Sequence, residues 1–82
     1  MKTGNKKTEG TAYTNLGDAY KELGDLQKAI EFFELSLSIA EKAGNKDCEG
    51  TAYNNLGDAY RDLGDLHKAI ESFQLSLSIA VK

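Results

Sequence analysis

The apolar residues of the first forty positions fall into two runs with helical spacing. They recur at intervals of three and four residues, first at Ala12, Tyr13, Leu16, Ala19, Tyr20 and Leu23, and then at Leu26, Ala29, Ile30, Phe33, Leu37 and Ala40. This spacing predicts two amphipathic helices. Between them lies Gly24-Asp25, in which glycine suits the left-handed residue after a helix and aspartate is a strong N-cap for the next one. The pattern therefore predicts an antiparallel helical hairpin.

The second helix of the hairpin carries a further apolar stripe at Phe32, Leu35 and Ile39. A helix that is apolar on two sides packs on two sides. We expect one stripe to contact the first helix of the same hairpin and the other stripe to contact the following unit.

The whole pattern occurs twice, with a shift of forty residues. Residues 4–42 and 44–82 differ at nine aligned positions. Self-similarity at such a period indicates a solenoid-type stack. Gly44-Asn45 again supplies a helix stop and an N-cap, and Asn5 has the capping role in the first unit. We predict helices near 6–23, 26–43, 46–63 and 66–81, within one domain (1–82) whose repeats are 4–43 and 44–82.

Composition narrows the class of protein. The chain of 82 residues is 40% hydrophobic and 28% charged, with a formal net charge of −3. Mixed charges argue against nucleic acid as a partner, because that partner needs a basic face. No apolar run approaches the roughly 20 residues of a membrane span, and no apolar stretch follows Met1–Lys7 as it would in a signal peptide. Cys48 is the single cysteine and favours a reducing compartment. We therefore expect a cytoplasmic location and no membrane contact.

Gly17 and Gly57 stand in the middle of predicted helices, where glycine is less favourable than alanine by about 1 kcal/mol. A phosphate-binding loop would explain them, but that loop needs lysine and a hydroxyl residue after its second glycine, where Asp25 stands. We interpret both glycines as places where the first helix of each hairpin comes close to Ala29 or Ala69 on the second.

The remaining reactive residues form no recognisable site. His67 and Cys48 have no ligands or general base at suitable spacing. The carboxylates lack the spacing of a calcium loop and read as a solvated helix face with two N-caps. The tyrosines could form an aromatic platform for a ligand, but their helical spacing beside leucine favours packing between helices. The sequence predicts no enzyme, no cofactor and no metal.

A family resemblance rests on residues that recur in both units. Tyr13, Leu16-Gly17, Tyr20, Gly24-Asp25, Ala29-Ile30, Phe33 and Leu37, with their counterparts in the second unit, resemble the signature of the tetratricopeptide repeat. The unit has forty residues instead of 34 and lacks the usual proline. In this it is similar to the longer repeats of spindle-orientation adaptors with Leu-Gly-Asn repeats. The resemblance implies an all-α fold, a right-handed superhelical stack of two antiparallel hairpins with lengthened helices.

The same resemblance implies a protein-binding module without catalysis, in which the first helices of the hairpins line a concave groove for a peptide or protein partner. The groove positions implied in the first unit are Thr11, Thr14, Asn15, Asp18, Lys21 and Glu22; those in the second are Thr51, Asn54, Asn55, Asp58, Arg61 and Asp62. Asp18 and Asp58 stand where the adaptors carry asparagine. An aspartate only accepts hydrogen bonds and brings charge, so the adaptors' ligand does not carry over directly.

A second hypothesis needs no ligand. The near-identity of the units and the missing polar cap suggest an engineered or excised repeat pair whose activity is folding and self-association. Leu75 and Ile79 then remain without cover at the end of the stack. They would mediate a homodimer, or the open ends would exchange helices in a domain swap.

Overall fold

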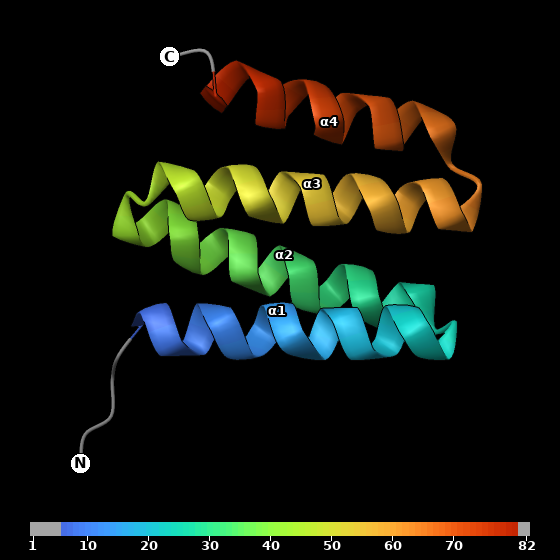
Figure 1. Cartoon of the computed structure of the whole chain (residues 1–82), viewed down its shortest axis with the longest axis horizontal. Coiled ribbons are helices and arrows are strands. Elements are labelled where there is room, and N and C mark those ends of the chain that lie inside the picture. The colour runs from blue at the N-terminus through green and yellow to red at the C-terminus, as the bar shows by residue number, and fades with distance from the viewer. Residues whose placement is uncertain (1–5, 81–82) are drawn as a thin grey trace.

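The computed structural model describes residues 6–80, with side chains from Thr8 onward, and folds this range into four helices without strands. The helices are α1 (Lys6–Leu23), α2 (Leu26–Ala43), α3 (Lys46–Leu63) and α4 (Leu66–Ala80). They lie side by side in chain order in a slab of 41 × 34 × 13 Å (Figure 1). The all-α stack of two hairpins is therefore confirmed, as are the bounds of the first three helices. The predicted cap at Asn5 and the helix end at position 81 lie outside the described residues.

Glycine and an Asp or Asn cap form each tight turn, as the sequence predicts. Gly24, Gly44 and Gly64 have φ angles of 89°, 68° and 95°, in the left-handed region that favours glycine. The carboxylate of Asp25 accepts a hydrogen bond from the backbone N–H of Lys28 (3.2 Å), and Asn45 accepts one from Cys48 (3.1 Å). These bonds satisfy N–H groups that have no partner within the helix. Each helix consequently reverses into the next one over two residues.

The core lies where α2 meets its two neighbours. Helix α2 packs against both α1 and α3, and α3 packs in turn against α4. Ala29 and Phe33 of α2 are buried together with Leu56 and Ala59 of α3. The interface between α2 and α3, which we call the seam, joins the two repeats.

Gly17 and Gly57 are packing positions, but their partner differs from the predicted one. A Cβ atom on Gly17 would lie 2.5 Å from Cε1 of Phe33, and one on Gly57 would lie 2.5 Å from Cε1 of Phe73. The nearest atoms thus belong to an aromatic ring and not to Ala29 or Ala69. Spacing alone could not reveal this, because the ring reaches across the hairpin one helical turn beyond the alanine.

The two apolar stripes of α2 contact different units as predicted, and the stripe of Phe32, Leu35 and Ile39 is the one that contacts its own hairpin. Phe32 stacks on Tyr13 and Tyr20 of its own hairpin, with ring centroids 6.1 and 5.5 Å apart. Leu35 stays exposed although α3 covers α2. Ile30 and Leu37, from the other stripe, pack on the core of the seam instead. Phe33 of that stripe also lies beside Gly17 of α1, so this one residue contacts both neighbours of α2.

Candidate functional site

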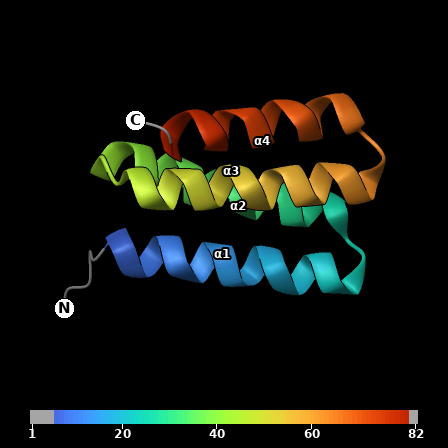
Figure 2. The ribbon, with the colours of Figure 1, turned by 45° about the horizontal axis from the view of Figure 1, so that its top comes forward.

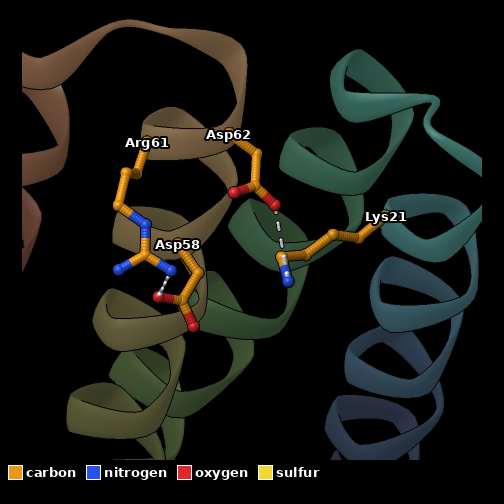
Figure 3. Close-up of polar contacts among 4 residues, drawn as sticks. All are labelled: Lys21, Asp58, Arg61 and Asp62. Atoms are coloured by element: carbon orange, nitrogen blue, oxygen red, sulfur yellow. Dashed lines mark ion pairs between the residues drawn. The ribbon is translucent and has the colours of Figure 1, made fainter.

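Helices α1 and α3 run in the same direction and flank α2 (Figures 1 and 2). The side chains of Lys21 and Asp62 reach from α1 and α3 toward each other across the ribbon of α2 (Figure 3), and Lys21 Nζ lies 3.6 Å from Asp62 Oδ2. The helices on which the sequence predicts a groove therefore border one surface, with α2 beneath it. We call this surface the groove.

A cleft of about 220 Å³ lies at the end of the groove where α1 and α3 begin. All three helices contribute to its mostly apolar walls. Its lining comprises Gly10, Thr11, Thr14, Ser36, Ile39, Ala40, Ala43, Asn45, Cys48 and Thr51. Thr11, Thr14 and Thr51 were predicted from the sequence, whereas the α2 residues were missed. Ser36 is the signal that could have found them, because it interrupts the buried stripe of α2 between Phe33 and Ala40.

Hydroxyl groups tie α1 to α2 along one wall of the cleft. Thr14 Oγ1 lies 3.0 Å from the carbonyl oxygen of Gly10 and 2.7 Å from Ser36 Oγ. Ser36 Oγ lies 3.2 Å from the same carbonyl. Thr14 is half-buried in this triangle, so its hydroxyl has a structural partner already. In the second hairpin, Ser76 donates to the carbonyl of Gly50, and Asn54, the counterpart of Thr14, is exposed.

Two carboxamides lie on the helices that border the groove. Asn15 is exposed and Asn55 is half-buried at the equivalent positions of α1 and α3. Within the described part of the chain, neither side chain has a hydrogen-bond partner. A carboxamide both donates and accepts, so this pair can bond the N–H and C=O of an extended backbone. Asp18, one turn further along α1, is exposed and likewise has no ion-pair partner among these residues.

Both cations at the other end of the groove are paired with carboxylates. Lys21 contacts Asp62 across the two repeats, and Arg61 Nη2 lies 3.3 Å from Asp58 Oδ1 on the same helix (Figure 3). Such exposed pairs contribute about 0–1 kcal/mol and weaken as salt is added. Counting all predicted groove positions, four carboxylates (Asp18, Glu22, Asp58 and Asp62) face two cations. The predicted groove positions together therefore carry a net negative charge.

The tyrosines of α3 belong to the seam. Burial raises the pKa of Tyr60, and the nearby Glu34 of α2 raises it further. Lys68 Nζ lies 5.5 Å above the ring of Tyr60. Burial likewise raises the pKa of Tyr53, with Glu41 and Glu49 adding to the effect. Both phenols stay protonated at neutral pH and pack between helices, as the sequence spacing favours.

The reactive residues stay apart from one another. Cys48 is an exposed free thiol at the rim of the cleft, and His67 is exposed on α4. Across the described range, no three His, Cys, Asp or Glu side chains gather in a way that could hold a metal ion. No helix in that range is long and apolar enough to cross a membrane. The groups available to a ligand are therefore the carboxamides, the charged side chains and the apolar cleft.

Comparison with known proteins identifies a family. The family model described as tetratricopeptide repeat matches residues 8–80 and so spans both hairpins. Among curated proteins, none matches the chain.

Proposed function

Because the chain belongs to the tetratricopeptide repeat family, whose repeats are in general scaffolds for protein interaction, we propose that it is a non-catalytic module that binds an extended peptide along the groove. The observation that carries this proposal is the contact between Lys21 and Asp62. It joins α1 to α3 on one surface, which supports a groove bordered by the first helices of both repeats.

The backbone of the peptide would be held by Asn15 and Asn55. Both carboxamides are free of partners in the described chain and lie one repeat apart. Each can replace the water around a peptide group with a hydrogen bond worth about 1 kcal/mol. Backbone recognition of this kind requires little from the sequence of the ligand.

A side chain of the peptide would enter the cleft beside Thr11 and Thr51. The walls of the cleft are mostly apolar, and its volume of about 220 Å³ accommodates an aliphatic side chain. Burying such a side chain contributes about 1.5–3 kcal/mol. The cleft thus favours peptides with a leucine or valine at one position.

Charge would select among such peptides. Lys21 and Arg61, the two cations among the predicted groove positions, are paired with Asp62 and Asp58, while Asp18 keeps an unpaired carboxylate. A peptide with lysine or arginine beside its apolar residue gains from the excess of carboxylates, and a peptide with glutamate does not.

Peptide titration tests the proposal. The probes are three fluorescent decapeptides, each with a central leucine flanked by lysines, by glutamates or by serines. We expect the lysine peptide to bind most tightly, with an affinity that falls as salt is added. The Asn15→Ala/Asn55→Ala variant should bind about tenfold to thirtyfold more weakly, because two hydrogen bonds of about 1 kcal/mol each are lost.

The matched control is Gln27→Ala/His67→Ala, which changes another pair of equivalent, exposed polar residues at the starts of α2 and α4. This control should leave binding unchanged. Equal affinities of the wild type and the asparagine variant would exclude the groove as the site. If none of the three peptides binds, the alternative gains: an engineered or excised pair whose activity is folding and self-association. A cytoplasmic location stays a prediction from the single cysteine.

A further inference from the structure

The seam shows how one repeat packs on the next. On the α3 side, Ala52, Leu56 and Ala59 are buried, and Leu56 is only 5% exposed. On the α2 side, Phe33 is fully buried, while Ile30 and Leu37 pack around it. The two sides together form the main apolar contact between the repeats in the described chain.

The same residues are uncovered on α1. Ala12, Leu16 and Ala19 are the forty-residue counterparts of the α3 side of the seam, and all three are exposed. Leu16 is 43% exposed, against 5% for Leu56. We call these three residues the α1 face.

The other side of the seam is uncovered on α4. Ile70 and Leu77, the counterparts of Ile30 and Leu37, are 55% and 62% exposed, and Phe73 is half-buried where Phe33 is fully buried. We call these three residues the α4 face. Helices α1 and α4 lie at opposite ends of the stack (Figure 1), so the two faces cannot cover each other within one molecule.

We propose that copies of this chain associate head to tail, with the α4 face of one copy on the α1 face of the next. We expect a second copy on each face because its α4 face repeats the α2 side of the seam and its α1 face repeats the α3 side. The two faces of neighbouring copies are therefore complementary in the same way as the two sides of the seam. At every position named in the two faces, the residue is the same as in the seam. The contact between copies is thus the seam repeated.

Charge supports the same pairing. Across the two repeats Lys21 of α1 meets Asp62 of α3. At the contact between copies, the equivalent positions bring Arg61 of one copy to Glu22 of the next, so cation and carboxylate are both retained. In the seam, the negative charge of Glu34 raises the pKa of Tyr60. At the contact between copies, the equivalent residues are the neutral Gln74 and Tyr20 of the next copy, so this charge is absent.

The association joins unlike faces and is therefore heterologous. Such a contact extends into open chains or closes as a ring, and it does not produce a two-fold dimer. Leu75 lies outside it. This residue is 44% exposed, as is Leu35 on α2, although α3 covers the seam side of α2. The exposure of Leu75 therefore does not arise from an uncovered end of the stack.

Mass measurements on single and mixed variants test the proposal. Sedimentation equilibrium of the 82-residue wild type should give a weight-average mass that rises with concentration above 8.9 kDa. Leu16→Glu blocks the α1 face and Leu77→Glu blocks the α4 face, and each variant alone should remain at 8.9 kDa. Mixed in equal amounts, they should form a complex of twice that mass and no larger species, because one intact face of each kind remains.

The control Leu75→Glu changes a leucine of similar exposure outside both faces and should associate as the wild type does. All three leucines are exposed, and helical circular dichroism should confirm that the variants fold. Four results would overturn the proposal: a wild type at 8.9 kDa at every concentration, association of Leu16→Glu by itself, loss of association in Leu75→Glu, or a mixture that stays monomeric. Peptide binding in the groove does not depend on either face, so the two proposals can fail separately.

Discussion

Gly17 and Phe33 show how one residue without a side chain permits another to be buried completely. The ring of Phe33 occupies the space in which a Cβ of residue 17 would lie, and no part of this ring reaches solvent. Gly10, on the same helix, has ordinary space around it, because its nearest neighbour, Cγ2 of Ile39, would lie 3.6 Å from an added Cβ. Both glycines lie within the same helix, but only Gly17 is at a position with no room for a Cβ atom.

Alanine at these two positions should consequently have opposite effects. Gly17→Ala should lower the free energy of unfolding by about 1–3 kcal/mol, because the buried ring must move out of a well-packed core. Gly10→Ala should raise it by up to about 1 kcal/mol through helix propensity. Urea unfolding measures both values. A stabilised Gly17→Ala variant would contradict the close packing of Phe33.

At the scale of the element, short polar signals set where each helix begins. Asp25, Asn45 and Asp65 each accept a hydrogen bond from the backbone N–H three residues later. The preceding glycine ends the earlier helix in the left-handed conformation. Both signals act within one turn of chain, which explains why the helix bounds agree with the sequence pattern.

Removal of one cap should weaken the stack. Asp65→Ala loses the bond to the N–H of Lys68 (3.2 Å) and should lower the free energy of unfolding by about 1 kcal/mol. Asp65→Asn is the matched control, since asparagine accepts the same bond as a neutral cap of similar strength. Thermal unfolding of the two variants measures the difference. An equal loss in both would assign the effect to the charge of Asp65 and not to its hydrogen bond.

At the scale of the whole molecule, position in the stack decides what an identical residue does. Leu16 and Leu56 occupy the same place in two nearly identical helices, yet one is exposed and the other is buried against α2. The difference arises because, in the described chain, α3 packs between α2 and α4, whereas α1 packs at the end of the stack against α2.

Truncation of these two leucines should therefore have unequal costs. Leu56→Ala should lower the free energy of unfolding by about 2–5 kcal/mol, because it leaves a cavity at the seam. Leu16→Ala should change it by less than about 0.5 kcal/mol, as surface substitutions usually do. Urea unfolding at concentrations at which the protein is monomeric gives both values. Equal losses would mean that the α1 face is covered in the monomer.

The amino-acid sequence by itself determined the local structure: four helices, their glycine stops, their caps and the pairing into two hairpins. These depend on groups within a few residues of one another. Through the family resemblance it also led to the prediction that side chains of α1 and α3 line a groove.

Only the tertiary structure decided which neighbour each side chain meets. In the structure, Phe32 stacks on Tyr13 and Tyr20, and the ring of Phe33 lies against Gly17. Lys21 forms an ion pair with Asp62. The tertiary structure also formed the cleft from three helices and exposed Leu16 while burying Leu56. The physical reason is that burial and pairing depend on which helices lie beside a side chain, and at what angle and distance. The two repeats are nearly identical in sequence, so their sequences cannot distinguish these surroundings. Their positions in the stack differ, and the surroundings of equivalent residues therefore differ as well.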